Sequence, residues 1–566
     1  MIKKLESPWT VALLALLFFV PFLGNVHLFD WDEINFAESA REMLLTQNYW
    51  RVQINFKPFW EKPPLFFWLQ VLSMKIFGVN EFAARFPNAV MGVVTLLTLF
   101  FVGKSLINKR FGFLWALAYL GSFTPHLYFK SGIIDPTFNY FMFLSVVCLT
   151  PVSVRIANPK LSGSALQMPT SNVARFFWAG LFAGLAVWTK GPVGVGIPTL
   201  TLGLVWVFNR FRPVVSFKQL LVYGGTAALV GASWVALLVV ESGWDTFLAF
   251  LEYLYRLGAT SEADHGEPFY YHFVVVLLGC FPISVLGMKY VFQISNIRYQ
   301  ISAVKYQISD NKYQTFSIFM LALFWVVMIV FSIVKTKIVH YSSMAYFPLS
   351  YLAALHLYNW LNGDVKWPRW ATVLTGVIGF LMAAVLVAVP LVGMYAPQIV
   401  PRIDDAFAVA NLRAPVEWGG WEWGIGAIYF AVVLYCLFIW QKCGWFAVKC
   451  LFLSTAICLM VYTAIVVPKI EGYSQRTVID FYESKRGQDV YVSPVGFHSY
   501  AHLYYFQKPM GSRPEASDEN WLLNGPVDKP TFVIARIDRA DDYYRNRNLE
   551  LIKEENGFVF FKRKTN

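Results

Sequence analysis

Charged residues are scarce in this chain of 566 residues. Asp, Glu, Lys and Arg make up 14% of it, against roughly 25% of a typical soluble domain. Hydrophobic residues make up 57%. This balance excludes a single soluble core and predicts a polytopic membrane protein.

Cysteine is also scarce, and its placement excludes a disulfide-stapled scaffold. None of the six cysteines lies in the hydrophilic region after Val467, and no Cys-x-x-Cys pair occurs. Disulfide frameworks and zinc knuckles need such sets. We therefore expect the cysteines to be small residues facing lipid or the core: Cys148, Cys280, Cys436, Cys443, Cys450 and Cys458.

The first apolar run, from Trp9 to Phe29, lacks a cleavage site. No small-x-small sequence follows it, and at about 20 residues it is long enough to span a bilayer. We expect a retained first helix rather than a signal peptide.

Long apolar segments are abundant, and we predict thirteen membrane spans, although the pair around Lys190-Gly191-Pro192 is also compatible with one broken helix. The predicted fold class is an all-α polytopic membrane region over residues 1–467, followed by a small α/β domain over residues 468–566. The predicted spans are 9–29, 81–103, 111–129, 135–154, 175–189, 190–208, 219–240, 271–294, 315–334, 342–361, 370–391, 423–440 and 447–467.

Basic residues concentrate on one side of the predicted membrane. With a cytoplasmic N-terminus, the cytoplasmic segments carry 18 basic and three acidic residues, whereas the whole chain has 47 basic and 35 acidic residues. This asymmetry satisfies the positive-inside rule. The net charge of +12 therefore reflects topology, and we expect no nucleic-acid partner.

An odd number of spans places the C-terminal domain outside the cytoplasm. Alternating apolar residues predict strands at 489–493, 531–537 and 557–562, and helical spacing predicts a helix at 499–507. This region contains no catalytic motif.

The same alternation gathers charged and polar side chains on the outer face. Lysines there are not explained by the positive-inside rule, so the gathering indicates a binding or catalytic site. The alternative is a polar loop or a set of structural ion pairs. The residues concerned are Asp32, Glu33, Arg41, Glu61, Lys62, Asp135, Lys190, Arg256, His265, Lys337, His340 and Tyr341.

The first outer loop, residues 30–80, contains two segments with helical apolar spacing, 34–45 and 65–77. We expect both to lie along the membrane surface with the apolar face down. Helices in that position would shape the mouth of a cavity.

These residue types suit transfer from a lipid-linked phosphate. Lysine and arginine can hold a phosphate whose tail stays in the bilayer, and fixed cations stabilise the charge that builds as the phosphate leaves. A nearby carboxylate can accept the proton of an incoming hydroxyl. Where the acceptor is itself a phosphate, no base is needed and the carboxylate would orient the sugar.

Six motifs occur together in this order over about residues 8–360. With them the chain resembles the polyprenyl-phosphate-dependent GT-C glycosyltransferases, closest to the lipid A aminoarabinose transferases and more distantly to protein O-mannosyltransferases. The motifs are Asp32-Glu33-(x)4-Glu38-(x)2-Arg41-Glu42-Met43, Phe59-Trp60-Glu61-Lys62-Pro63-Pro64-Leu65, Phe77-Gly78-Val79-Asn80-Glu81-Phe82-Ala83-Ala84-Arg85-Phe86-Pro87, Asp135-Pro136, Thr189-Lys190-Gly191-Pro192 and Lys337-(x)2-His340-Tyr341.

The resemblance implies a role for each matched position. Asp32 matches the family's essential acidic residue, with Glu33 beside it, and Asp135 matches a further polar residue of the cavity. Lys62 matches a lysine that contacts the lipid phosphate. The remaining phosphate ligands implied are Arg256, Tyr341 and Lys337, and the remaining cavity residues are Lys190, Arg41 and His340.

The chain departs from the family pattern at two places. One departure concerns recognition of the donor or acceptor head group, and the other concerns the metal site found in relatives. Asp32-Glu33-Ile34-Asn35 lacks the arginine of the family's Asp-Glu-Ala-Arg, and Tyr253 replaces the histidine of Glu-His-x-x-Arg. In relatives that histidine can join the Glu of Glu-Lys-Pro-Pro at a metal site. Glu61 and His265 can still meet around a divalent cation, but one histidine and one carboxylate are a weak ligand set. We expect no required cofactor.

The expected function is an inverting membrane glycosyltransferase that moves a sugar from a polyprenyl-phosphate donor to a lipid, glycan or protein acceptor. We expect a monomer in the inner membrane with a periplasmic or extracellular C-terminal domain. Two alternatives stay open: a lipid-linked sugar transporter (flippase), and an oligosaccharide ligase or polymerase that needs a pyrophosphate-linked donor.

Overall fold

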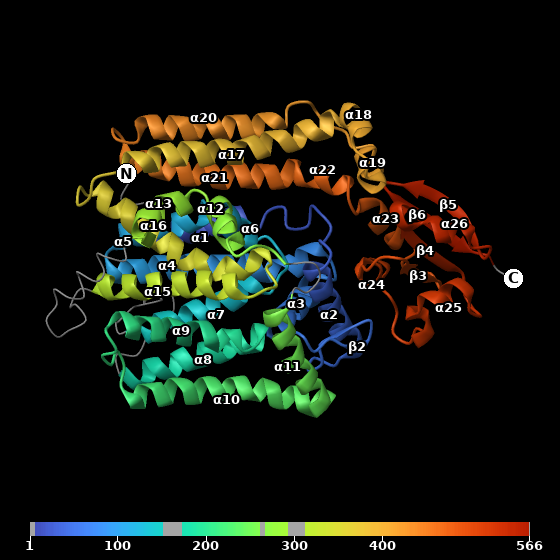
Figure 1. Cartoon of the computed structure of the whole chain (residues 1–566), viewed down its shortest axis with the longest axis horizontal. Helices are drawn as coiled ribbons and strands as arrows, with labels where there is room; N and C mark the ends of the chain where they lie inside the picture. Colours follow the sequence, from blue (N-terminus) through green and yellow to red (C-terminus); the bar gives the residue numbers. More distant parts are fainter. Residues whose placement is uncertain (1–5, 151–171, 261–265, 293–311, 565–566) are drawn as a thin grey trace.

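A computed structural model describes residues 6–150, 172–260, 266–292 and 312–564. Helices dominate it and lie side by side along one direction (Figure 1). The N-terminus lies at one end of these helices, and a β-sheet near the C-terminus lies at the other, close to α2 (Asp32–Thr46) and α3 (Leu65–Phe77) (Figure 1).

The first helix is shorter than predicted. Helix α1 covers Pro8–Phe19, and the chain leaves the helix before Pro21. Proline has no N–H to continue the helical hydrogen bonds. A helix of 12 residues is about 18 Å long, too short to cross the bilayer core alone. The prediction of a span over 9–29 is therefore wrong in its second half.

The segment around Lys190 forms a helical hairpin. Helix α8 (Asn172–Lys190) and helix α9 (Val193–Phe208) lie side by side (Figure 1). Gly191 turns the chain with φ of +87°, where a glycine is favoured. A Cβ on Gly194 would come within 2.7 Å of Ala186, so the two helices meet closely. The structure favours two helices over one broken helix, and it places Lys190 at the turn.

A helix lies in every other predicted span, and two of these spans are interrupted: the segment 111–129 divides at Gly121 and Ser122 into α5 (Lys109–Leu120) and α6 (Phe123–Tyr128). The segment 271–294 divides at Pro282 into two helices, and residues 151–154 and 293–294 of the predicted spans lie outside the described residues. The helices are α4 (Glu81–Leu106), α5 (Lys109–Leu120), α6 (Phe123–Tyr128), α7 (Asp135–Leu149), α10 (Phe217–Ser242), α12 (Tyr271–Gly279), α13 (Ile283–Phe292), α15 (Lys312–Ile333), α16 (Tyr346–Leu361), α17 (Arg369–Met394), α20 (Trp423–Ile439) and α21 (Gly444–Ile465).

Five helices in the described part of the chain are long and apolar enough to cross a membrane: 81–106, 217–242, 313–333, 369–394 and 444–472. Five further apolar helices are shorter, among them α1 and α9. The chain is therefore a mostly helical, multi-pass membrane protein. Thirteen spans remains a prediction.

Aromatic side chains fill the centre of the helical region. Trp115 is fully buried, donates a hydrogen bond through Nε1 to Ser350 Oγ at 3.0 Å, and packs edge-on against Tyr351. Phe143 and Phe347 stack with ring centroids 4.5 Å apart. Helices α5, α7 and α16 are thus held together by large rings, which bury more apolar area per residue than aliphatic side chains.

The C-terminal region contains a mixed four-stranded sheet in the order β3-β4-β6-β5. Strands β3 and β4 are parallel, and β6 runs antiparallel to both β4 and β5. The three predicted strands and the predicted helix are present, within two or three residues at each end; β5 was not predicted. The elements are α22 (Val467–Gly472), α23 (Arg476–Ser484), β3 (Tyr491–Pro494), α24 (Ala501–Phe506), α25 (Glu519–Asn524), β4 (Thr531–Arg536), α26 (Asp541–Arg545), β5 (Leu549–Glu555) and β6 (Phe558–Arg563), with η4 (Pro514–Ser517) and η5 (Ile537–Arg539) between them.

Short helices and turns connect the longer elements. A two-stranded antiparallel hairpin, β1 with β2, follows α2. Helix α11 follows α10 in the chain. These connecting elements are β1 (Gln53–Ile54), β2 (Lys57–Pro58), α11 (Trp244–Ala259), η2 (Val339–Ala345), α18 (Ala396–Ile399), η3 (Val400–Arg402) and α19 (Ala406–Leu412).

The C-terminal region packs against the segment that the sequence predicts as the first outer loop. The Leu28 N–H donates to Tyr505 Oη at 2.6 Å, and Arg41 Nη2 donates to the Lys508 carbonyl at 3.1 Å. Helix α2 is buried from Glu33 to Met43, polar residues included. Both predicted loop helices exist as α2 and α3, but α2 is enclosed by protein rather than laid open on a surface, because the C-terminal region packs over it.

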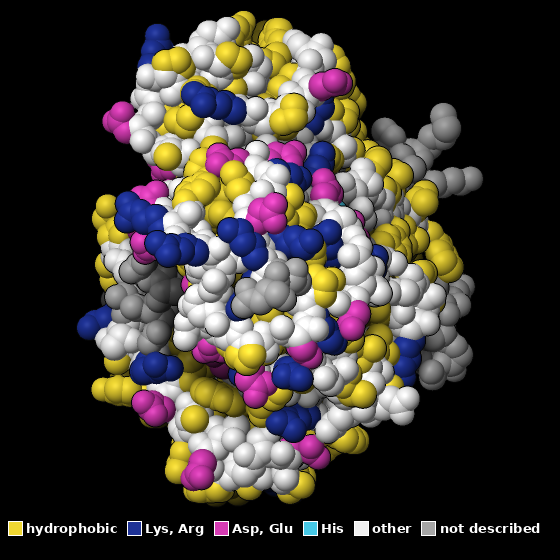
Figure 2. Space-filling view, turned by 90° about the vertical axis from the view of Figure 1, so that its right-hand side faces the viewer, with side chains coloured by type: hydrophobic (Ala, Val, Ile, Leu, Met, Phe, Trp, Pro, Cys, Tyr) yellow, Lys and Arg dark blue, Asp and Glu magenta, His cyan; other side chains and the backbone are white. Residues whose placement is uncertain are grey.

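The end of the molecule that carries the sheet is rich in charge of both signs (Figure 2). Lys and Arg side chains alternate there with Asp and Glu, and apolar side chains gather towards the sides (Figure 2). This distribution agrees with the hydrophilic composition of the region after Val467.

Candidate active site

Four polar side chains from separate elements lie close together. Nε2 of His340 lies 3.7 Å from Oδ2 of Asp32 and 4.0 Å from Oδ2 of Asp135. Lys190 Nζ donates to Asp135 Oδ1 at 2.6 Å. The sequence analysis named all four residues, and the structure brings them together.

The ends of helices position this group. Asp32 and Asp135 are the first residues of α2 and α7, and Lys190 is the last residue of α8. Carboxylates are stabilised at helix N-termini and lysines at helix C-termini by the helix dipole. Three helix ends therefore meet here, and each carries a side chain whose charge is stabilised by the dipole of its own helix.

The two aspartates differ in access. The side chain of Asp32 is 41% exposed, whereas that of Asp135 is 5% exposed. Asp135 pairs with Lys190 and faces His340. Asp32 is the carboxylate of this group that can reach a substrate.

His340 lies between opposite charges. Burial lowers the pKa of His340; Asp135 and Asp32 act against this shift, and Lys190 and Lys62 act with it. The imidazole is therefore neutral near pH 7. Asp32 and Lys62 are therefore both near enough to influence the charge of this ring.

Lys62 is held by aromatic residues. Its Nζ donates to Tyr253 Oη at 3.3 Å, and it also lies 5.4 Å from the Tyr253 ring centroid. The Trp60 ring packs edge-on against the same tyrosine at 6.1 Å. Oε2 of Glu61 lies 3.9 Å from Lys62 Nζ. Pro63 and Pro64 lead directly into α3, which fixes the backbone beside this lysine.

Tyr341 connects the two parts of the site. Its ring lies 5.4 Å from Lys190 Nζ and 5.5 Å from the His340 ring. Burial raises the pKa of the Tyr341 phenol, and the charges of Asp135, Asp32 and Glu61 raise it further. The phenol therefore stays protonated and can donate a hydrogen bond to an anion.

Lys337 and Arg256 belong to two segments that are connected by a backbone hydrogen bond. The Lys335 N–H donates to the Gly258 carbonyl at 3.4 Å, which ties the loop before η2 to the end of α11. Lys337 is buried, and its Nζ donates to the Val334 carbonyl at 2.9 Å. Arg256 lies exposed in the last turn of α11.

Glu33 lies apart from this group and binds Arg85. The Arg85 guanidinium donates to both oxygens of Glu33 at 2.9 and 2.7 Å, and the backbone N–H groups of Phe29 and Gly132 donate to the same carboxylate. Burial alone would raise the pKa of Glu33, but Arg85 holds it below its usual range. Both Glu33 oxygens thus accept hydrogen bonds from protein donors beside Asp32; the catalytic role that the sequence predicts for Glu33, together with Asp32 and Asp135, stays a prediction.

Arg41 also lies away from the group. Its guanidinium forms two 2.7 Å hydrogen bonds with Glu38 and contacts the C-terminal region through Lys508. The predicted cavity role does not fit this position, because the side chain is buried against protein. His265, the partner expected for Glu61 at a metal, lies outside the described residues.

The sequence analysis missed several residues that build the site. Arg85 donates to the carbonyls of Leu23, Val26 and His27 as well as to Glu33, and so fixes the chain that enters α2. The motif that contains Arg85 was noticed, but no role followed from it. From the C-terminal region, the Tyr500 ring packs edge-on against Trp31, which precedes Asp32.

Comparisons with known proteins bear on this arrangement. Residues 61–237 match the family described as dolichyl-phosphate-mannose-protein mannosyltransferase. That range contains Lys62, Asp135 and Lys190 but neither Asp32 nor His340.

The chain is 26% identical over 293 residues to an undecaprenyl phosphate-alpha-4-amino-4-deoxy-L-arabinose arabinosyl transferase of Proteus mirabilis, a match that spans half of each chain. A protein of the same description from Pectobacterium atrosepticum is 25% identical over 446 residues, which are 74% of this chain and 73% of that one. The chain thus spans about half the length of the first of these relatives and about three quarters of the second.

A solved structure has the same fold. The crystal structure of ArnT from Cupriavidus metallidurans bound to undecaprenyl phosphate superposes with a TM-score of 0.73 at 16% identity, covering 98% of this chain and 97% of that one. The resemblance expected from the motifs is confirmed: the chain is similar in sequence to undecaprenyl-phosphate aminoarabinose transferases and, over residues 61–237, to the dolichyl-phosphate-mannose-protein mannosyltransferase family, and it has the fold of ArnT.

Proposed function

We propose that this protein is an inverting membrane glycosyltransferase that takes a sugar from a polyprenyl-phosphate donor. The acceptor is a lipid of the lipid A type, a glycan or a protein, and transfer takes place on the non-cytoplasmic face. The observation that carries the proposal is the meeting of exposed Asp32 with His340, Asp135 and Lys190, while Lys62 acts on the same histidine.

In this proposal the donor phosphate binds between Lys62 and Tyr341. Lysine supplies a compact positive charge and the protonated phenol supplies a directed hydrogen bond. Arg256 and Lys337 follow from the resemblance as further phosphate ligands, on segments that the backbone joins at Gly258. A small pocket beside the same lysine is lined by Trp60 and Trp234 together with Arg51 and Glu241.

Transfer breaks one bond and makes another. An acceptor oxygen attacks the anomeric carbon from the face opposite the phosphate, the carbon–oxygen bond to the phosphate breaks, and the phosphate leaves with the electron pair. Lys62 and Tyr341 stabilise the charge on the leaving phosphate. The proton of a hydroxyl acceptor passes to Asp32; with a phosphate acceptor no proton moves and Asp32 orients the sugar. Attack from the opposite face inverts the anomeric centre.

The proposed setting is the inner membrane, with the N-terminus in the cytoplasm and residues 468–566 in the periplasm or outside the cell. We propose a monomer with no required cofactor. A divalent cation held by Glu61 and His265 remains a subsidiary proposal, and Glu61 is within 3.9 Å of a lysine that competes for it.

The test compares Asp32→Asn with wild type and with Asp404→Asn, a control at an exposed acid far along the chain. Purified proteins in lipid vesicles receive a polyprenyl-phosphate donor with a radiolabelled sugar, and both transfer and donor binding are measured. If Asp32→Asn loses sugar transfer but still binds the donor, the glycosyltransferase proposal is supported. Unchanged transfer by Asp32→Asn overturns the role of Asp32, and donor movement across the membrane without transfer by wild type indicates a transporter. Activity only with a pyrophosphate-linked donor indicates the ligase or polymerase.

A further inference from the structure

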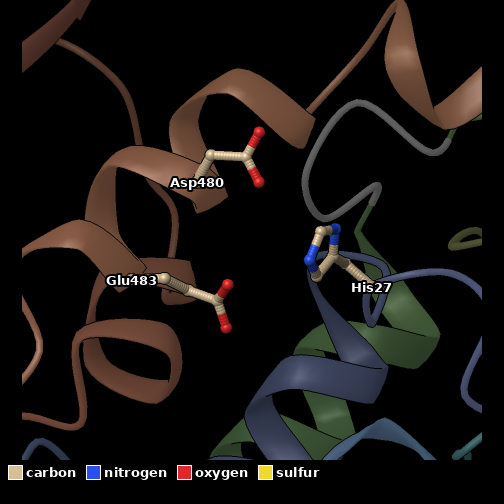
Figure 3. Close-up of side chains that lie close together, drawn as sticks. All are labelled: His27, Asp480 and Glu483. Atoms are coloured by element: carbon tan, nitrogen blue, oxygen red, sulfur yellow. The ribbon is translucent and has the colours of Figure 1, made fainter.

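Three metal-ligating side chains meet away from the active site, where the first loop contacts the C-terminal region. His27, Asp480 and Glu483 each offer a ligand atom, and these atoms lie within 4.8 Å of one another. No other set of three His, Cys, Asp or Glu residues this close occurs in the part of the chain that the structure describes. Figure 3 shows the imidazole directed at the two carboxylates.

The two carboxylates share one face of a helix. Asp480 and Glu483 are three residues apart on α23, a spacing that puts side chains next to one another on a helix surface. Both are exposed, so both can rotate. Ligand atoms with bonds of about 2.0–2.2 Å to one zinc ion lie roughly 3.5 Å apart, and a small rotation of either carboxylate closes the remaining gap.

The histidine is held in an orientation that suits a ligand. Nδ1 of His27 lies 2.7 Å from Oε1 of Glu471, a carboxylate that is buried. Figure 3 shows the other ring nitrogen turned towards Asp480 and Glu483. A carboxylate behind a histidine that ligates a metal fixes its tautomer and makes it a better ligand. This contact comes from α22 and is independent of the two carboxylates on α23.

Three carboxylates, those of Glu471, Asp480 and Glu483, lie near two arginines around this histidine. Arg476 occupies the other oxygen of Glu471, with Nη2 to Oε2 at 2.7 Å, and Arg486 Nη2 lies 2.9 Å from Oε1 of Glu483. Glu483 keeps its second oxygen for a ligand, and the Asp480 carboxylate faces the histidine (Figure 3). An ion here would relieve the repulsion between two neighbouring carboxylates.

We propose that His27, Asp480 and Glu483 bind a divalent transition-metal ion of the Zn²⁺ type, with water completing the coordination. One imidazole and two carboxylates suit zinc better than magnesium or calcium, which take mainly oxygen ligands. The ion ties the chain just before α2 to the C-terminal region. It thereby fixes the entry to the segment that carries Asp32, in addition to the Leu28 to Tyr505 hydrogen bond.

The experiment uses the full chain purified in detergent and stripped of metal with a chelator. Zinc chloride is added, bound zinc is counted after desalting, and the melting temperature is measured with and without zinc. The variant is Asp480→Asn with Glu483→Gln. The control is Asp541→Asn with Asp542→Asn, which removes an equally charged acidic pair from the first turn of another short helix, α26.

Wild type and the control should each bind one zinc ion more than the variant, and their melting temperatures should rise with zinc by several degrees. The variant should need about 100-fold more zinc for the same rise. Equal zinc counts in all three proteins, or an equal rise in the variant, would overturn the site. A zinc ion at Glu61 and His265 adds equally to all three counts. Sugar transfer is measured separately in zinc-free buffer, so failure of this site leaves the proposed function untouched.

Discussion

His340 and Asp32 come from segments that lie far apart in the sequence, yet Nε2 of His340 lies 3.7 Å from Oδ2 of Asp32. The 3.7 Å contact joins η2, which follows α15, to the first residue of α2. The His340 side chain is 17% exposed and that of Asp32 is 41% exposed, so Asp32 is the partner of this contact that can reach a substrate.

The first prediction concerns His340 and pH. Its pKa in the folded protein lies below its ordinary value because of burial, so the unfolded chain takes up a proton first as the pH falls. Stability is therefore lost below about pH 6.5. His340→Gln should lose less stability than wild type between pH 7.5 and pH 5.5, measured as melting temperature. The control is His498→Gln, at an exposed histidine; an identical pH dependence of wild type and His340→Gln would contradict the neutral imidazole.

The second prediction concerns the pair of Asp135 and Lys190. Removing one partner leaves the other charge buried, which costs about 3 kcal/mol or more. Asp135→Asn and Lys190→Gln should each destabilise the protein, and the double variant should be less destabilised than the sum of the two. Chemical denaturation of all four proteins gives this coupling. Additive effects would mean that the 2.6 Å contact makes no net contribution.

The third prediction concerns Lys62. A hydrogen bond to a charged group contributes about 1.5–3 kcal/mol, so Lys62→Gln should weaken binding of undecaprenyl phosphate about tenfold or more. The matched control is Lys75→Gln, because Lys75 also lies over a tyrosine ring, at 4.5 Å from the Tyr49 centroid, but on the exposed side of α3. Equal affinity of the two variants would remove Lys62 from the phosphate site.

The fourth prediction concerns Glu42, buried beneath the C-terminal region. Burial and the charge of Glu38 raise the pKa of Glu42 to about 8. A raised carboxyl pKa means that the folded protein holds a proton that the unfolded chain releases, so stability falls as the pH rises from about 4.5 to 8. Glu42→Gln removes this loss, and its stability advantage over wild type should grow through that range. Glu550→Gln, at an exposed strand residue, should show no such trend; a constant difference for Glu42→Gln would contradict the shift.

Much of the candidate site could be predicted from the sequence, because alternation of the predicted spans puts the loops that carry its residues on one face. Asp32, Asp135, Lys190 and His340 come from four distant segments and meet as expected. Periodicity also predicted α2 and α3. These features depend on patterns that repeat along the chain and are therefore visible in it.

Other features depend on packing between distant residues. Glu33 and Asp32 are adjacent in sequence, yet Arg85 binds one and leaves the other exposed. The contact of Leu28 with Tyr505 joins positions 477 residues apart and carries no local pattern. Pro21 indicates the end of α1 in the sequence, but apolar residues continue on both sides of it, so apolar length alone predicted a longer helix.

The most direct test of the shared external site is cysteine labelling of Asp32→Cys and Lys62→Cys in right-side-out membrane vesicles with a maleimide that does not cross membranes. Natural Cys443 is exposed and lies in a predicted cytoplasmic segment, so it reports whether vesicles have opened. Both introduced cysteines should be labelled in sealed vesicles, and undecaprenyl phosphate should protect both, while Cys443 reacts only after the vesicles are opened. Labelling of positions 32 and 62 from opposite sides, or no protection of either, would contradict a single external site.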